Sequence, residues 1–457
     1  MGSTIKRVLV ANRGEIAVRI IRACRELGIE TVQAYSQADA DSLAVAMADR
    51  RVCIGYPRAS DSYLNARALV SAALVQGADA IHPGYGFLSE RAEFAELCAE
   101  QGLVFIGPSA EVIRQMGDKA RARELARQAG VPTTPGSQGV LGDAEQALAV
   151  AQRIGYPVLL KAVAGGGGRG MRVVNQAQAL PGAFAEASRE ARMAFGDGSM
   201  YLEKFLTRVR HIEIQVLGDG QQVVHLGERD CSTQRRNQKL IEESPSPILD
   251  EALRQRIGEA AVALARLVGY RSAGTMEFIL DPRTREFYFM EMNTRIQVEH
   301  PVTELVTGVD LVKEQLRIAG GEPLGLRQQD VQLRGHAIEC RINAEDAERN
   351  FMPTPGTISA YHAPGGPGIR IDSHLYSGYT VPPYYDSLLG KLIAWGSDRA
   401  EAIARMQRAL AELRVDGVHT TAAFHRRLLD TAAFRDADIH TRFIEEEFLA
   451  PPAAAAA

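Results

Sequence analysis

The chain begins with short apolar runs that alternate with amphipathic segments. The apolar runs predict strands over residues 7–11, 30–35, 52–54, 78–82 and 103–106. Between them, apolar residues recur at helical spacing over residues 15–27, 65–76 and 91–101. Strands that alternate with helices through short connections predict a doubly wound parallel sheet, which is an α/β fold. No GxGxxG sequence follows the first strand, so a dinucleotide site is not indicated.

Hairpins replace this pattern in the middle of the chain. Strands are expected at 157–162, 171–174, 200–205, 211–217, 223–227, 275–280 and 287–293, and helices at 143–154 and 250–268. The strand at 211–217 has polar side chains at 211, 213 and 215 and apolar ones between them, which predicts one polar and one apolar face. From about residue 335 onward the pattern predicts an α+β region.

A glycine-rich loop follows the predicted strand 157–162, which carries Lys161 near its end. It contains Gly165 to Gly168, then Arg169 and Gly170. Consecutive glycines let backbone N–H groups turn towards an anion, and they let a loop move as a lid. The loop lacks the Gly-Lys-Ser/Thr of a Walker A motif, and a flexible linker is the alternative interpretation. The lysine at the end of the strand favours phosphate binding.

The last predicted hairpin carries a candidate metal site. Period-2 alternation places Glu291 and Asn293 on one face. If Asp281 pairs with Phe287 across the turn, Glu277 lies opposite Glu291. Two carboxylates and an amide oxygen suit Mg²⁺ or Mn²⁺ held together with nucleotide phosphates. The alternative is a solvent-facing sheet, but like charges directly opposite one another destabilise a sheet, so a cation between them is favoured.

Polar residues at alternate positions follow this hairpin. Arg295, Gln297 and Glu299 offer a cation, an amide and a base, which suits a small anion and its deprotonation. A solvated edge is the alternative for such a run taken alone. The basic segment from Gln234 to Lys239 lacks interleaved aromatic residues, so a phosphate or carboxylate contact is favoured over nucleic acid.

Composition excludes several classes of protein. A chain of 457 residues with 46% hydrophobic and 24% charged residues is globular and long enough for two or three domains. The net charge of −4 argues against a nucleic-acid or membrane-surface protein. No apolar run approaches the roughly 20 residues that span a bilayer, and no secretory leader is evident, so we expect a cytoplasmic location. The five scattered cysteines indicate reduced thiols, with no disulfide frame or zinc site.

Lysine is rare in this chain. It occurs only at positions 6, 119, 161, 204, 239, 313 and 391, and nearly all other basic residues are arginine. Because arginine serves as the general surface cation, the few lysines are expected to be enriched where a compact ammonium group is needed.

Taken together, these segments resemble the biotin carboxylase family of ATP-grasp enzymes from about Ile5 to about Phe443. The family-type stretches are ANRGEI at 11–16, HPGYGFLSE at 82–90, MGDK at 116–119, the glycine loop, RDCS at 229–232, EMNTRIQVEHP at 291–301, ECRINAE at 339–345 and YYDS at 384–387. A single glycine-rich loop would be a weak signal. Many long blocks in the family order are specific.

The resemblance implies ATP- and bicarbonate-dependent carboxylation of biotin through carboxyphosphate. It implies ATP contacts at Lys119, Lys161, Gly167, Gly168, Glu203, Lys204, Phe205, Leu206, His211, Gln234, Asn237, Glu277 and Ile279. It implies bicarbonate contacts at Lys239, Arg295, Gln297, Val298 and Glu299, with Glu299 as the base. Arg341 would stabilise the biotin enolate beside Tyr85, and two Mg²⁺ or Mn²⁺ ions would bind Glu277, Glu291 and Asn293. Catalysis would rest on Arg295, Glu299, Lys239 and Arg341.

The resemblance also implies a domain division and partners. An N-terminal domain at 1–115, an ATP-grasp domain at 116–330 with a mobile lid at about 132–204, an α+β domain at 331–447 and an Ala/Pro-rich tail at 448–457 are expected. The chain has no Met-Lys-Met attachment site, so biotin must come on a carrier protein or domain, and a carboxyltransferase must complete the reaction. Family members usually form homodimers. The final acceptor stays open among acetyl-CoA, another acyl-CoA, pyruvate and urea, with an acyl-CoA favoured.

Two departures from the family pattern and two rival functions remain. Asn237 stands where many members have histidine, and it can hydrogen-bond but cannot carry charge, while Ala164 shortens the glycine run by one. The rivals are another carboxyphosphate-forming ATP-grasp ligase and a non-catalytic nucleotide-binding partner of a carboxylase. The blocks at 234–239 and 294–301 favour biotin.

Overall fold

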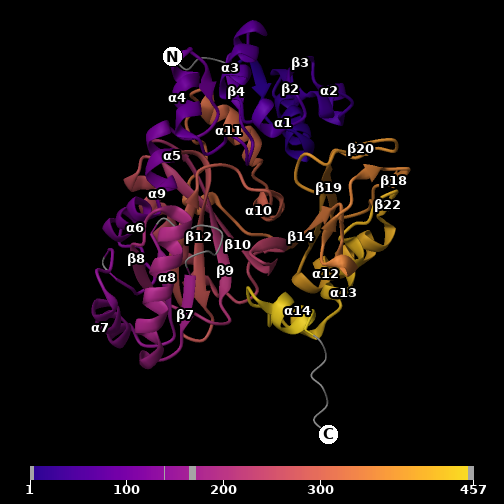
Figure 1. The fold of residues 1–457 in the computed structure, drawn as a ribbon. Helices are drawn as coiled ribbons and strands as arrows, with labels where there is room; N and C mark the ends of the chain where they lie inside the picture. The colour runs from indigo at the N-terminus through magenta and orange to yellow at the C-terminus, as the bar shows by residue number, and fades with distance from the viewer. Residues whose placement is uncertain (1–4, 138, 164–170, 451–457) are drawn as a thin grey trace.

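Three main sheets organise the chain, which the computed structural model describes over residues 5–137, 139–163 and 171–450. They have five, eight and three strands, and three two-stranded sheets accompany them. In Figure 1 the five-stranded sheet lies at the top, the three-stranded sheet at the lower left and the end of the eight-stranded sheet at the right. In these described ranges, no helix combines the length and the apolarity that crossing a membrane requires.

The N-terminal sheet is parallel, with strand order β3-β2-β1-β4-β5, as the alternating pattern predicts. Its elements are β1 (Arg7–Val10), α1 (Gly14–Glu26), β2 (Glu30–Ser36), α2 (Leu43–Met47), β3 (Arg50–Gly55), α3 (Ala66–Val75), β4 (Ala80–His82), α4 (Ala92–Glu100) and β5 (Val104–Phe105). The strand order reverses between β1 and β4, and ligands bind at the carboxyl ends of strands at such a point. There Asn12 ties the two strands together, because its amide donates to the carbonyls of Pro83 and Tyr85, each over 2.7 Å.

The eight-stranded sheet is antiparallel, with strand order β13-β12-β9-β10-β11-β14-β21-β19. Its strands are β9 (Arg210–Asp219), β10 (Val223–Arg235), β11 (Gln238–Ser244), β12 (Arg271–Asp281), β13 (Glu286–Asn293), β14 (His336–Asn343), β19 (Ile369–Ser373) and β21 (Leu388–Gly396). The pairing of β11 with β14 carries the sheet across the boundary expected at 330/331. The sequence pattern did not predict β11 as a strand, and β10 extends well beyond the predicted 223–227.

Both faces of β9 are buried. Its apolar residues Ile212, Ile214 and Val216 pack in one core with α9 (Glu251–Leu267), which covers that face. The polar residues at alternate positions, such as Glu213, are also buried and point to the other face. The predicted alternation is therefore confirmed, but the polar face is enclosed by protein and is not in solvent.

The three-stranded sheet has a core of its own. Strands β6 (Val158–Ala162), β7 (Met171–Val174) and β8 (Met200–Lys204) pair in the order β7-β6-β8, and α7 (Ala144–Ile154) and α8 (Leu180–Phe195) pack on them. The strands and α7 agree with the sequence pattern, whereas α8 was not predicted. This unit occupies the place expected for the lid.

Further helices and short strands complete the fold. They are α5 (Ala110–Gly117), α6 (Lys119–Gln128), α10 (His300–Thr307), α11 (Leu311–Ala319), β15 (Glu345–Asp346), β16 (Met352–Pro353), β17 (Gly356–Thr357), β18 (Ala360–His362), β20 (Thr380–Val381), α12 (Arg399–Glu412), β22 (Arg414–Asp416), α13 (Ala422–Leu429) and α14 (Ala432–Arg435). Helices α12, α13 and α14 share a core with β14 and β21, which gives the α+β region that the sequence predicts.

Candidate active site

A cavity of about 610 Å³ lies between strands β9 to β14 and the loop that follows β4. It brings together these predicted residues: Tyr85, His211, Gln234, Asn237, Lys239, Glu277, Glu291, Asn293, Arg295, Gln297, Val298, Glu299 and Arg341. The lining does not include Lys119, Lys161, Glu203, Lys204, Phe205, Leu206 and Ile279. Gly167 and Gly168 lie outside the described residues.

Glu299 is a buried carboxylate that two cations hold in this cavity. It is 1% exposed, its Oε1 accepts from Lys239 Nζ over 2.9 Å and its Oε2 accepts from Arg341 Nη2 over 2.8 Å. Burial opposes ionisation of Glu299, but the charges of Lys239 and Arg341 outweigh it and hold the pKa well below its usual range. The side chain is therefore an ionised carboxylate with a fixed orientation.

Lys239 gathers three carboxylates on one ammonium group. Its Nζ donates to Glu213, to Glu277 over 3.0 Å and to Glu299. Burial opposes its charge, yet the three carboxylates raise its pKa well above the usual value. Glu213 is fully buried, and burial is the main reason that its pKa rises to about 7. Lys239 thus holds the side chains of Glu213, Glu277 and Glu299 close together.

Arg295 and Gln297 point into the cavity with Glu299, as the alternating run predicts. These residues do not form a regular strand. They point into the cavity because the chain turns between β13 and α10. Arg295 donates to Glu90 over 2.9 Å and to Asn293 Oδ1 over 3.0 Å. The amide of Gln297 donates to Glu277 over 2.9 Å, which fixes its orientation.

Glu277 lies opposite Glu291 as the sequence predicts, although the predicted register is wrong at the turn. Asp281 pairs with Glu286, not with Phe287. A bulge then shifts the register between Phe278 and Glu277 and restores Glu277 opposite Glu291. The unpaired residue of this bulge is Met290 on β13, and its insertion brings Glu277 and Glu291 opposite each other.

These residues fit a divalent cation. Burial, and next the charge of Glu277, raises the pKa of the Glu291 carboxyl. A cation between the two carboxylates relieves both effects, and oxygen ligands suit Mg²⁺ or Mn²⁺. Within the described residues, a second group of possible ligands comprises His211, Glu213 and Glu277. It shares Glu277 with the predicted set.

His211 and Gln234 adjoin this carboxylate pair. His211 Nε2 lies 3.1 Å from Glu277 Oε2, and its Nδ1 lies 3.4 Å from the Gln234 amide. Burial opposes charge on His211, but Glu277 outweighs it and raises the pKa of the imidazole. Ile279 is half-buried and pairs with His211 in the register of β12 and β9. Three residues predicted to contact the nucleotide, His211, Gln234 and Ile279, therefore lie on three adjacent strands, β9, β10 and β12, of which β12 carries Glu277.

Other predicted nucleotide contacts belong to the lid or to α6. Lys161 on β6 pairs with the buried Glu203 on β8, which also pairs with Arg123. Lys204 donates to the carbonyls of Gly155 and Tyr156 over 3.1 and 2.8 Å. Phe205 and Leu206 follow β8 and are half-buried.

Lys119 is the first residue of α6 and is exposed. Its charge acts to lower the pKa of Glu291, so the two side chains are close enough to interact. Lys119 therefore lies within electrostatic reach of Glu291, and its side chain is exposed.

The backbone conformation at position 237 explains why asparagine suits this position. It and Arg236 form the two-residue turn between β10 and β11, with φ of 64° and 49°. A turn with positive φ at both central residues favours asparagine. The departure from histidine at 237 therefore suits the backbone of this hairpin.

Family comparisons match three regions of the chain. The description "Biotin carboxylase, N-terminal domain" matches residues 4–113, and "Biotin carboxylase C-terminal domain" matches residues 339–446. Between them, "Carbamoyl-phosphate synthase L chain, ATP binding domain" matches residues 118–327. The ATP-binding match alone also suits another carboxyphosphate-forming ATP-grasp ligase, but the two flanking matches do not.

A curated biotin carboxylase of Nostoc sp. is 58% identical to this chain over 441 residues, which cover 96% of this chain and 98% of that protein. The chain belongs to the biotin carboxylase family. It is therefore an ATP-grasp ligase that carboxylates biotin. This confirms the resemblance inferred from the sequence motifs.

Two solved structures place the fold in the biotin carboxylase family as well. A biotin carboxylase–beta-gamma-ATP complex from Campylobacter jejuni is 50% identical, with a TM-score of 0.90 and coverage of 96% of this chain and 98% of that chain. The biotin carboxylase domain of a thermophilic 2-oxoglutarate carboxylase, bound to bicarbonate, is 51% identical, with a TM-score of 0.93 and coverage of 97% and 98%.

Sequence reasoning missed several charged residues that this biotin carboxylase site uses. Arg229 is fully buried and donates to Glu213 over 3.2 Å and to Gln297 Oε1 over 3.1 Å. Glu242 is also fully buried and accepts from Arg341 Nε over 2.6 Å. The alternation of β9 was a signal for Glu213, and Arg229 lies in a family-type stretch. For Glu242 the sequence contains no such signal.

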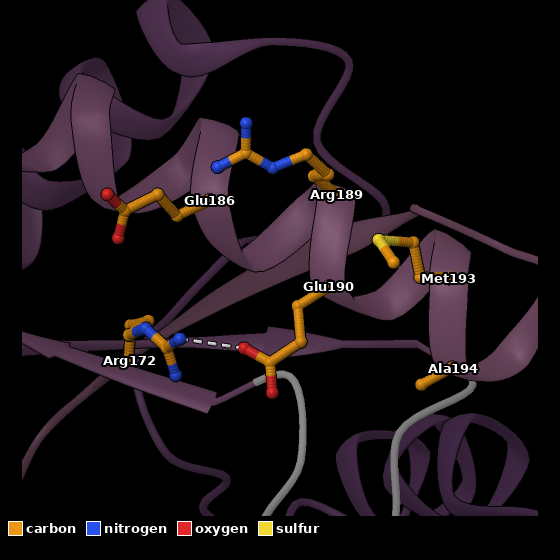
Figure 2. A pocket seen from close by; sticks show the side chains of 6 residues that line it. All are labelled: Arg172, Glu186, Arg189, Glu190, Met193 and Ala194. Carbon is orange, nitrogen blue, oxygen red and sulfur yellow. Dashed lines mark hydrogen bonds and ion pairs between the residues drawn. The ribbon is translucent and has the colours of Figure 1, made fainter.

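A second hollow lies on the unit formed by the three-stranded sheet and α8, away from these residues. Figure 2 shows Arg172 and Glu190 facing each other across it, with Glu186, Arg189 and Met193 on α8 around them. The Arg172–Glu190 ion pair measures 2.7 Å, and its side chains are 43% and 37% exposed. Among the residues that the structure describes, none of the predicted site residues lines this hollow, and a solvent-accessible pair of this kind contributes little to stability.

Proposed function

We propose that the cavity binds bicarbonate at Lys239, Arg295, Gln297, Val298 and Glu299, and that Glu299 is the base. The observation that carries this proposal is the buried, ionised carboxylate of Glu299 held between Lys239 and Arg341. Glu299 takes the proton of bicarbonate. The freed oxygen attacks the γ-phosphorus of ATP, the bond to the leaving ADP oxygen breaks, and carboxyphosphate forms.

The nucleotide is assigned to the neighbouring strands and the lid. We assign ATP contacts to Lys119, Lys161, Gly167, Gly168, Glu203, Lys204, Phe205, Leu206, His211, Gln234, Asn237, Glu277 and Ile279. Two Mg²⁺ or Mn²⁺ ions would be held by Glu277, Glu291 and Asn293, and when bound they would neutralise phosphate charge. The cations of Lys119 and Lys161 act in the same direction, since they screen the triphosphate from the incoming anion.

Biotin is assigned to Tyr85 and Arg341. Carboxyphosphate breaks its C–O bond to phosphate and gives CO₂ and phosphate, and the phosphate takes the N–H proton of the biotin ureido ring. Arg341 stabilises the enolate that results, and the ring nitrogen attacks CO₂ to form carboxybiotin. The support is that Arg341 and Tyr85 line the same cavity as Glu299.

We propose that the chain acts in a larger carboxylase. Biotin arrives on a carboxyl carrier protein or domain, a carboxyltransferase uses the product, and the chain works as a homodimer in the cytoplasm. We favour acetyl-CoA or another acyl-CoA as the final acceptor, as in fatty acid biosynthesis. The proposed division is 1–115, 116–330 with a lid at 132–204, 331–447, and a tail at 448–457.

One assay tests this function. Purified protein with MgATP should release phosphate only when bicarbonate is present, and free biotin should raise that rate and yield carboxybiotin. Bicarbonate-dependent phosphate release that biotin neither accelerates nor converts to carboxybiotin would instead support another carboxyphosphate-forming ligase. No phosphate release at all would support a non-catalytic partner.

A further inference from the structure

Lys391 is a fully buried lysine that the assigned chemistry does not use. It lies on β21, is 0% exposed and pairs with Arg341 in the register of β14 and β21. Its Nζ donates to the carbonyl of Val298 over 2.7 Å and lies 3.2 Å from Glu15 Oε2. A fully buried ammonium group is rare unless it is paired, so these two contacts account for its presence there.

The Val298 contact reaches the bicarbonate segment. Val298 lines the cavity, and the next residue, Glu299, is the N-cap of α10. The Val298 carbonyl belongs to the peptide that links these two residues. Because Lys391 donates to that carbonyl, it fixes the peptide plane from which the Glu299 side chain departs.

The Glu15 contact reaches the other end of the cavity. Glu15 lies in the first turn of α1, is 2% exposed and accepts a hydrogen bond from the hydroxyl of Tyr85. These two residues follow β1 and β4, so the switch point of the parallel sheet brings them together. A continuous chain of contacts therefore runs from Tyr85 through Glu15 and Lys391 to Val298.

Stability alone is a poor reason for such a pair. Burying two charges costs desolvation, and apolar residues of similar volume often stabilise a protein as well or better. A pair that touches both sides of a substrate cavity has a second role available, which is to hold the two sides at a fixed separation.

We propose that the Lys391–Glu15 pair positions both substrates, with Lys391 orienting the Val298–Glu299 peptide towards bicarbonate and Glu15 orienting Tyr85 towards biotin. This inference rests on the proposed function. It makes Lys391 and Glu15 positioning residues, because neither is assigned a contact with the reacting atoms. The two roles can be tested separately, since Lys391 contacts the residues assigned to bicarbonate and Glu15 contacts Tyr85, which is assigned to biotin.

Two double variants of the 457-residue chain distinguish the role of Lys391 from that of Glu15. K391M/E15Q removes both charges but leaves an amide oxygen that can accept from Tyr85, whereas K391M/E15L removes that acceptor too. We expect the KM for bicarbonate to rise about tenfold in both doubles, the size of one lost charged hydrogen bond. The KM for free biotin should rise about tenfold only in K391M/E15L, and the KM for ATP should stay unchanged in both.

The single variant K391M and a surface control complete the test. K391M leaves Glu15 buried and unpaired, so its Tm should fall, and K391M/E15Q should recover it. Lys313 also pairs with a glutamate of α1, Glu26, but away from the cavity, so K313M should leave every KM unchanged.

Recovery of both Tm and bicarbonate KM in K391M/E15Q would mean that the pair only balances charge, and the inference would be overturned. Equal biotin KM in the two doubles would remove the proposed role of Glu15. The proposed function is tested separately by Glu299→Gln, which should be inactive whatever the pair does.

Discussion

Arg341 donates a hydrogen bond from Nη2 to Oε2 of Glu299 over 2.8 Å. The residue assigned to the biotin enolate therefore touches the residue assigned to bicarbonate deprotonation. Nε of the same guanidinium donates to the buried Glu242. A planar group with donors on two edges holds the two carboxylates in a fixed relative orientation, which the compact ammonium group of a lysine does not define. The group assigned to enolate stabilisation and the group assigned to bicarbonate deprotonation thus form one ion pair.

Glu299→Gln should abolish bicarbonate-dependent turnover. Glutamine keeps the size of the side chain but cannot take a proton, and loss of a general base costs about 10²- to 10⁴-fold in rate. ATP affinity should change little, because the nucleotide is assigned to other residues. The measurement is phosphate release with bicarbonate together with ATP binding by calorimetry. The exposed Glu322→Gln serves as control. Near wild-type kcat in Glu299→Gln would withdraw the assignment of the base.

Arg341→Ala should separate carboxyl transfer from ATP cleavage. Loss of one oriented donor to an oxyanion costs about 10²- to 10³-fold, and this loss should appear in carboxybiotin formation. The slow, biotin-independent ATPase should fall less. Both rates are measured on one preparation, and Tm is recorded because Glu242 loses its cation. Arg341→Lys, which keeps the charge but not the fork, should fall between. Equal loss of both activities would move Arg341 to the nucleotide or bicarbonate.

Glu291→Gln should weaken the metal requirement of the site. A neutral amide replaces one of the two facing carboxylates, so the Mg²⁺ concentration for half-maximal ATP cleavage should rise about tenfold or more. High Mg²⁺ should restore most of the rate, and the KM for biotin should not change. The exposed Glu286 on the same strand provides the control variant Glu286→Gln. An unchanged Mg²⁺ dependence would contradict the metal assignment.

Glu243 should make the protein sensitive to acid. Burial opposes its ionisation, but the hydrogen bond from His336 and the charge of Arg399 outweigh burial and lower the pKa to about 2. A lowered carboxyl pKa adds stability that is present above the unfolded value of 4.5 and is lost as pH falls towards 2.

Urea unfolding measures this contribution. The free energy of unfolding of Glu243→Gln should lie below that of the wild type by on the order of 3 kcal/mol at pH 7. The difference should shrink as pH falls below about 4.5. A difference that stays constant over this range would show that ionisation of Glu243 is not its source.

The spacing of polar and apolar residues was sufficient to predict many of the helices and strands. The alternation along 211–217 predicts the two faces of β9, and helical spacing predicts α1 and α9, because each depends only on neighbouring residues. The Glu277–Glu291 pair shows the limit of this reasoning. The predicted pairing at the turn was off by one residue, and the bulge that corrected it is a long-range packing feature that alternation does not encode.

The sequence by itself determined the family, the ATP-grasp chemistry and the candidate residues, since these lie in contiguous motifs whose order is specific. Only the tertiary structure decided which charges are buried and which groups they meet. The pairing of β11 with β14 places Glu242 beside Arg341, and the meeting of β1 with β4 places Glu15 beside Tyr85. A charged residue in a sequence is by default solvated, and only non-local packing removes the water and supplies its partner.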